Sequence, residues 1–101
     1  MGACNFIEFG IGKTAREAFD ALVEQATWEY GHDPYNGTIS TTSLSRRPPK
    51  VIRKRFTEKA RQEAIEAAEA DDWGKKRESR AIDCGATKGG HVWAFYGWAA
   101  C

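Results

Sequence analysis

The chain has 101 residues, of which 42% are apolar and 12% aromatic, and its formal net charge is +1 at pH 7. This length supports one domain rather than two, and the apolar content excludes intrinsic disorder. No apolar run approaches the roughly 20 residues of a membrane-spanning helix, and the N-terminus lacks the pattern of a signal peptide. We therefore expect a single cytoplasmic domain, residues 1–101, with no membrane contact.

The three cysteines, Cys4, Cys84 and Cys101, are odd in number and widely spaced. No Cys-x-x-Cys pair or Cys/His cluster is present, and His32 and His91 are the only histidines. A zinc site needs such clusters, so we expect no metal and no cofactor. We interpret the three cysteines as small buried or terminal thiols in a reducing compartment.

Residues 5–11 have the apolar pattern of a strand, and the next segment begins a helix. Thr14 and Glu17 form a Thr-x-x-Glu capping box. Apolar residues then recur at helical spacing with acids on the opposite side. Gly31 and Pro34 predict that this helix ends near Tyr30.

The loop that follows this helix places an imidazole, a carboxylate, a phenol and an amide within one turn, at His32, Asp33, Tyr35 and Asn36. These groups are suited to holding a phosphate, a base edge or a peptide backbone. The alternative is a helix-stop turn in which Asp33 and Asn36 bond their own backbone. Both interpretations stay open.

Residues 38–44 are rich in β-branched side chains with weak alternation, which predicts an edge strand open to sheet-extending dimerisation. Between residues 46 and 61 there are eight basic residues and one acid, Glu58. This density is typical of a phosphate-contacting arm, with Phe56 available to stack on a base. A solvated face or a surface for an acidic protein is the alternative, because the net charge is small. The candidate binding residues here are Arg46, Arg47, Lys50, Arg53, Lys54 and Arg55.

Residues 57–72 predict a second helix with Thr57 as its N-cap and a thin stripe of alanines. Residues 80–86 and 91–99 predict a hairpin, and the second strand is apolar on both faces, which favours a central position. We expect an α+β fold of order β-α-β-α-β-β, with a mainly antiparallel four-stranded sheet. One face of the central strand should pack against the two helices, and the other should be partly covered.

Four segments, residues 1–4 (MGAC), 12–19 (GKTAREAF), 30–39 (YGHDPYNGTI) and 95–100 (FYGWAA), resemble small proteins encoded by phages and mobile elements. The resemblance implies a bacterial host cell as the setting and transfers no catalytic residue. By analogy with compact phage-encoded accessory proteins, it implies a non-enzymatic inhibitor of a host factor, such as an anti-CRISPR or another anti-defence protein. The implied partner is a host protein or ribonucleoprotein complex, bound through the loop and the basic residues by a monomer or homodimer.

Two other classes of function stay open. In a small phosphodiester or nucleotide hydrolase, His32 would act as acid or base, Asp33 would orient it, and Tyr35 or Asn36 would hold the substrate. In a cyclic-nucleotide sponge, Trp28, Tyr35 or Trp93 would stack on bases while arginines hold phosphates. Either would make a nucleotide or a nucleic acid the ligand.

Overall fold

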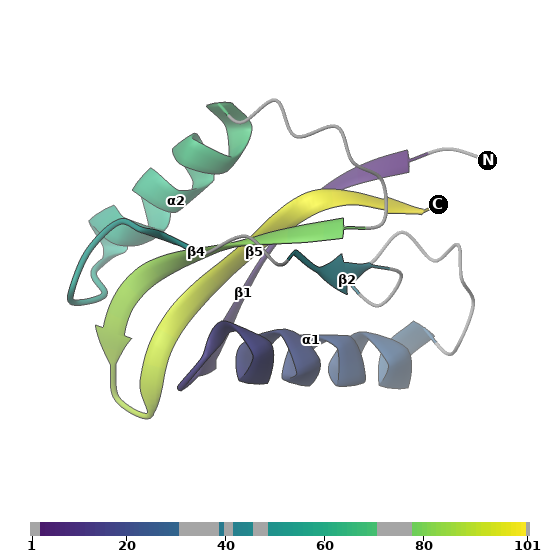
Figure 1. Cartoon of the computed structure of the whole chain (residues 1–101), viewed down its shortest axis with the longest axis horizontal. Helices are drawn as coiled ribbons and strands as arrows, with labels where there is room; N and C mark the ends of the chain where they lie inside the picture. Colours follow the sequence, from purple (N-terminus) through teal and green to yellow (C-terminus); the bar gives the residue numbers. More distant parts are fainter. Residues whose placement is uncertain (1–2, 31–38, 40–41, 46–48, 71–77, 101) are drawn as a thin grey trace.

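Two helices lie on opposite faces of a mixed five-stranded sheet (Figure 1). The structure is a computed structural model that describes residues 3–30, 39, 42–45, 49–70 and 78–100. It forms one α+β domain, as the sequence predicts. The elements are β1 (Ala3–Gly12), α1 (Ala15–Tyr30), β2 (Ser43–Leu44), β3 (Lys50–Val51), α2 (Glu58–Ala70), β4 (Glu78–Thr87) and β5 (Gly90–Ala100).

The strand β5 lies at the centre of the sheet, whose order is β1-β5-β4-β2, with β3 also paired to β4. It runs antiparallel to β1, with Gly12 opposite His91, and antiparallel to β4, with Thr87 opposite Gly90. The predicted hairpin and the predicted central position of its second strand are both confirmed.

The sheet differs from the predicted mainly antiparallel, four-stranded one because β2 and β3 both pair with β4 in parallel. The predicted strand over residues 38–44 is reduced, within the described residues, to Ser43–Leu44. Thr42 explains where it begins, since both its backbone N and its Oγ1 donate to the carbonyl of Ile39, at 3.0 and 2.7 Å. These bonds close a local turn in place of a strand ladder.

Each face of β5 is covered by a different helix, so the prediction that both helices share one face is wrong. Trp93 and Phe95 pack with buried residues of α1, whereas Val92 and Ala94 pack with the alanines of α2. Successive residues of a strand point to opposite faces. The two-sided apolar character of β5 therefore comes from one helix on each side.

The helix α1 begins as the capping box predicts, because the backbone N of Glu17 donates to Thr14 Oγ1 at 3.1 Å. Its buried face centres on Phe19, whose ring meets that of Phe95 edge to face with 5.6 Å between centroids. Its exposed face carries the acids Glu17, Asp20 and Glu24.

The helix α2 lies on the sheet through side chains no larger than a methyl group. Ala60, Ala64 and Ala68 are its buried residues, and they pack in one cluster with Ile82 and Cys84 of β4. Thr57 acts as the predicted N-cap, since its Oγ1 accepts from the N of Ala60 at 3.3 Å. The alanine stripe therefore lets the helix backbone approach the sheet closely.

We expect Ala64→Leu to destabilise the fold by about 1–3 kcal/mol, because the added atoms must enter a closely packed layer. Gln62→Leu, at an exposed position of the same helix, should change stability by less than about 0.5 kcal/mol. Chemical denaturation of both variants gives the two values. Equal effects would show that the alanine stripe does not determine how closely α2 packs.

Candidate functional site

Six of the predicted site residues lie outside the residues that the structure describes, so their roles stay predictions. They are His32, Asp33, Tyr35, Asn36, Arg46 and Arg47. The remaining four, Lys50, Arg53, Lys54 and Arg55, are described and exposed.

The basic segment that contains these four residues is held along the edge of β4 by backbone hydrogen bonds. The N of Ile52 donates to the carbonyl of Asp83 at 2.9 Å, and farther on the N of Ala86 donates to the carbonyl of Lys54 at 2.8 Å. The N of Phe56 returns a bond to the carbonyl of Ala86 at 2.9 Å. Ile52 and Phe56 also pack against the cluster beneath α2. The backbone of the segment is therefore fixed, while its charged side chains stay exposed.

A β-bulge in β4 lets this segment come close. The register shifts between Asp83 and Gly85, and Gly85 has a φ of 113°, in the left-handed region. A Cβ at Gly85 would lie 2.5 Å from the carbonyl carbon of Arg55 and 2.7 Å from the N of Phe56. Asp83 Oδ1 stabilises the bulge by accepting from the N of Gly85 at 2.9 Å. Only glycine at position 85 is compatible with this approach.

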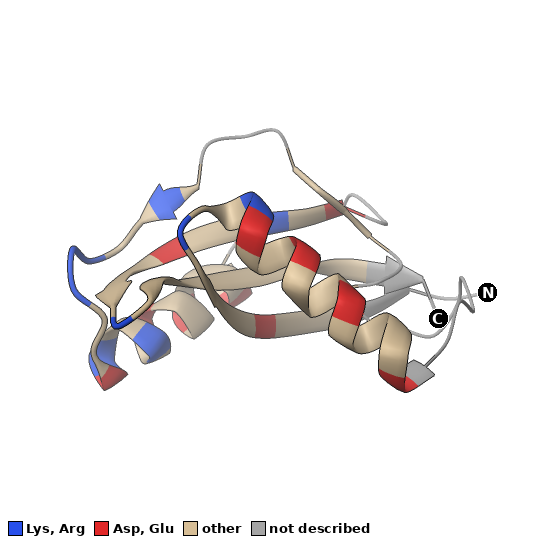
Figure 2. Cartoon of the chain, turned by 90° about the horizontal axis from the view of Figure 1, so that it is seen from below, with Lys and Arg blue, Asp and Glu red and all other residues tan. Residues whose placement is uncertain are grey.

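Four exposed cations from three segments of the chain converge around the β4–β5 turn. Lys88 lies in the turn. The backbone of Arg55 forms a parallel β-bridge with Ala86, just before the turn, and Lys54 precedes Arg55 in the chain. Lys13 is placed by the turn as well, since a Cβ at Gly90 would lie 3.1 Å from its N. We call this group, Lys13, Lys54, Arg55 and Lys88, the basic end. Figure 2 shows Lys and Arg gathered at this end of the molecule, while acids follow the exposed face of α1.

The basic end has no counter-ions of its own, because none of its four side chains forms an ion pair within the described part of the chain. Arg53 differs, since its Nε and Nη2 lie 3.0 and 2.5 Å from Glu63 Oε1 of α2. Arg61 also turns away, with its guanidinium 5.1 Å from the centroid of the Phe9 ring. The cations between residues 46 and 61 therefore do not form one surface: Lys54 and Arg55 belong to the basic end, whereas Arg53 and Arg61 contact other side chains.

An imidazole and a carboxylate meet beside the basic end. His91 Nδ1 lies 3.0 Å from Asp83 Oδ1, and the side chain of Asp83 is 13% exposed while that of His91 is 39% exposed. Arg55, Ala86 and His91 pair in one row across the sheet, and Ala86 is exposed between the two larger side chains. Residues paired in register share a face of the sheet. The guanidinium of Arg55 and the imidazole of His91 are therefore on either side of the small, exposed side chain of Ala86.

The Asp83–His91 pair is a feature that our sequence analysis missed. Its only signal was the predicted hairpin, which brings the two residues onto neighbouring strands. Cys84, between Asp83 and Gly85, is no nucleophile for this pair. It is fully buried, and this burial raises the pKa of its thiol to about 11. The interpretation of Cys84 as a small buried thiol is confirmed.

A hollow of about 420 Å³ opens along β1, the strand at the opposite edge of the sheet from β2. Glu8 of β1 and Glu29 of α1 both line it, and Glu8 Oε2 is buried without a hydrogen-bond partner among the described residues. Burial, and to a lesser degree the negative charge of Glu29, raise the pKa of Glu8. The full lining is Ile7, Glu8 and Phe9 of β1, Leu22, Gln25, Ala26 and Glu29 of α1, and Arg61 of α2.

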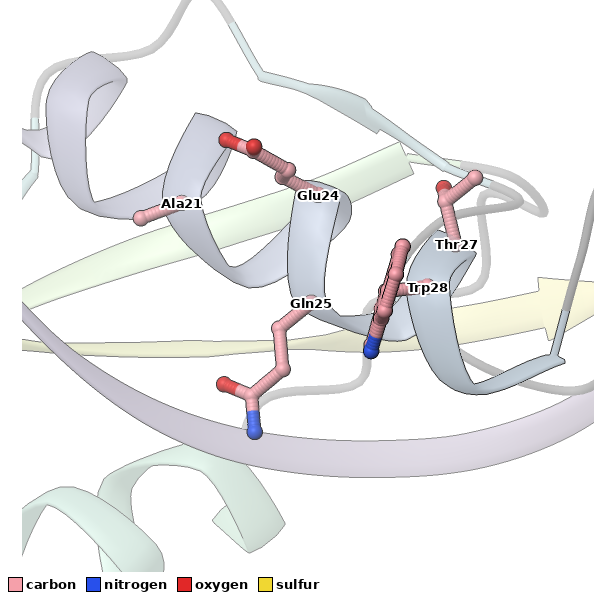
Figure 3. Close-up of a pocket in the computed structure, with 5 residues that line it drawn as sticks. All are labelled: Ala21, Glu24, Gln25, Thr27 and Trp28. Atoms are coloured by element: carbon pink, nitrogen blue, oxygen red, sulfur yellow. The ribbon is translucent and has the colours of Figure 1, made fainter.

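A neighbouring hollow on α1 shares one lining residue with this hollow and includes an exposed aromatic. The shared residue is Gln25, and the neighbouring hollow, of about 620 Å³, is also lined by Ala21, Glu24, Thr27 and Trp28. Figure 3 shows the side chains of Gln25 and Trp28 next to each other on α1, with Gln25 extending toward β1. Trp28 is 90% exposed, although large aromatics usually contribute to cores. We call the two hollows together the β1 groove.

Comparison with protein-family models, with curated proteins and with solved structures gave no match for this chain. The resemblance to phage-encoded proteins therefore remains a prediction from the sequence. Among the described residues, no helix combines the length and apolar character needed to cross a membrane. No group of three or more His, Cys, Asp or Glu side chains in the same part of the chain is arranged to hold a metal ion. What the chain does must be argued from its two charged surfaces.

We expect Gly85→Ala to destabilise the fold by about 2–4 kcal/mol, because it adds both backbone strain and a clash with the basic segment. Gly89→Ala is the matched control, since Gly89 also has a positive φ, of 94°, but nothing lies within 4 Å of its Cβ position. It should cost only about 1 kcal/mol. Thermal and chemical denaturation measure both, and equal costs would argue against the close approach at Gly85.

We expect Glu8→Gln to make the fold more stable than wild type at pH 7. Glu8 has a raised pKa in the folded state, so its contribution is favourable when protonated at low pH and is lost as the pH rises through that raised pKa. The gap between variant and wild type should therefore close below about pH 4. Denaturation between pH 3 and 7 measures the gap, with Glu24→Gln, at an exposed position of α1, as the control. A Glu8→Gln gap independent of pH would contradict the assignment.

Proposed function

We propose that this chain is a non-enzymatic binding protein that inhibits a host factor by placing its basic end against an anionic surface. The observation that carries the proposal is the convergence of Lys13, Lys54, Arg55 and Lys88 around one turn, with no counter-ion within the described residues. Surface charges without partners add little to the stability of a fold. Their concentration on a fixed backbone is typical of a surface that recognises opposite charge.

A carboxylate-rich protein surface suits the basic end better than a long nucleic acid. The acidic face of α1 carries Glu17, Asp20 and Glu24, and these would repel phosphates that extended past the basic end. Binding to nucleic acid draws its affinity from many phosphate contacts, whereas a local patch needs only a few well-placed charges. The partner in this proposal is a host protein or the protein part of a ribonucleoprotein complex. An anti-CRISPR or other anti-defence role belongs to the proposal through the resemblance to phage-encoded proteins.

A phosphate-bearing ligand is the second candidate, and one observation favours it. Arg55 and His91 flank the exposed, small Ala86 in a single row of the sheet. A phosphate group over Ala86 would be within the span of a guanidinium and an imidazole, both of which donate hydrogen bonds to phosphate. This candidate includes the nucleotide sponge. The hydrolase alternative depends on His32, Asp33 and Tyr35, which lie outside the described residues.

We expect the double variant Lys54→Glu, Arg55→Glu to bind its partner at least about ten-fold more weakly, because two attractions become repulsions. The partner would first be captured with the tagged chain from a bacterial lysate, and bound proteins, nucleic acids and nucleotides identified in one eluate. Titration calorimetry with that partner then gives the affinities. Both side chains are exposed, so circular dichroism should show an unchanged fold.

Arg16→Glu is the control for overall charge, since Arg16 is not one of the four residues of the basic end and already pairs with Asp20 on α1 at 3.3 Å. It should leave the affinity within about two-fold of wild type. Unchanged affinity in the double variant would remove the basic end from the function. A nucleotide or nucleic acid in the eluate without a stoichiometric protein would support the second candidate instead.

A further inference from the structure

The outer edge of β1 is the longest strand edge that the described part of the chain leaves unpaired. β1 has ten residues and pairs only with β5 there, whereas β2 and β3, at the opposite edge, have two residues each. An unpaired edge presents backbone N–H and C=O groups that another extended chain can bind. Our sequence analysis placed the edge open to such extension at residues 38–44, but the structure places the long open edge at β1.

The side chains around this edge specify what kind of chain fits. Glu8 and Glu29 both line the β1 groove, and Glu8 Oε2 has no hydrogen-bond donor within the described residues. Arg61, the cation in the lining, lies over the ring of Phe9. A carboxylate oxygen that is buried without a partner costs free energy, which a donor from outside would recover. The missing group is therefore a cation that also donates hydrogen bonds.

A second copy of this chain is a poor occupant of the edge. β1 has the sequence ACNFIEFGIG, which contains no Lys and no Arg. If two β1 strands paired antiparallel, Glu8 would meet no cation on the other strand in any register. In the centred register it would face Ile7, and in the neighbouring register, one residue away, it would face the other Glu8. Like charges directly opposite one another destabilise a strand pair.

We propose that the β1 groove binds an extended segment of another protein, which adds to the sheet as a strand beside β1 and places a Lys or Arg side chain between Glu8 and Glu29. The strand edge supplies backbone hydrogen bonds, and the two carboxylates select the side chain. Trp28, exposed at the end of the groove, supplies an apolar contact for the same segment. This goes beyond the proposed function, because it assigns a second surface of opposite charge on the other side of the sheet from the basic segment.

A displayed library of random decapeptides tests this directly, with selection on wild type, Glu8→Gln and Glu8→Lys. Wild type should enrich peptides with alternating β-branched residues and one fixed Lys or Arg. Glu8→Gln should bind a selected synthetic peptide roughly ten-fold more weakly. Glu8→Lys should instead enrich peptides with Asp or Glu at the fixed position.

The backbone part of the proposal has a separate measurement. A selected peptide would be synthesised with N-methyl groups on its odd-numbered or on its even-numbered residues. Only alternate amides of an added strand bond to the edge, so one set should abolish binding and the other should be tolerated. Slower hydrogen exchange of the β1 backbone amides in the complex would show that the peptide binds along β1.

Two variants separate this proposal from others. Glu17→Gln, on the exposed face of α1 and outside the groove lining, controls for charge, and the double variant Lys54→Glu, Arg55→Glu should keep full peptide affinity. Failure of the basic end and failure of the groove are then distinguishable. The proposal is overturned if selected peptides show no Lys or Arg preference, if Glu8→Gln binds them as wild type does, or if both N-methyl sets are tolerated. A dimer in sedimentation with protected β1 amides would assign the edge to a second copy instead.

Discussion

The rest of the fold depends on burying both faces of β5. Val92 and Ala94 need cover on one side, Trp93 and Phe95 on the other, and a single helix supplies each cover. Because β5 must also be hydrogen bonded along both edges, β1 and β4 are placed antiparallel on either side of it. The two outer edges of the sheet follow from this: β4 receives the short parallel strands, and β1 is left with a groove.

Close approach at glycine converts this framework into a charged surface. The left-handed Gly85 brings the backbone of Arg55 against β4, and Gly90 allows the carbonyl of Gly12 to lie beside the turn. The same carbonyl of Gly12 accepts a 3.0 Å hydrogen bond from Trp93 Nε1, which ties the end of β1 to the core. The cations of the basic end are thus exposed on backbone that the core fixes, so recognition would cost little ordering of the main chain.

Sequence patterns over short stretches correctly predicted the features that depend on interactions between residues close in sequence. The caps at Thr14 and Thr57, the alanine stripe of α2 and the β4–β5 hairpin all follow from residues close in sequence. The parallel pairing of β2 and β3 with β4 joins segments far apart in sequence, and no periodicity encodes it. Charge density predicted the basic segment but not its division, because the pairing of Arg53 with Glu63 depends on where α2 lies. The Asp83–His91 pair was missed because it depends on the register across a bulge.

The net charge of +1 therefore does not describe how charge is distributed over the surface of this chain. Cations gather at the β4–β5 turn, while carboxylates occupy the face of α1 and the β1 groove. Charges that cancel in the sum give weak long-range attraction, so association with any partner would be steered little from a distance. Complementarity at contact would instead select the partner and its orientation, since a partner docked backwards would meet like charge at both surfaces. The segregation of charge thus favours specific recognition over general polyanion binding.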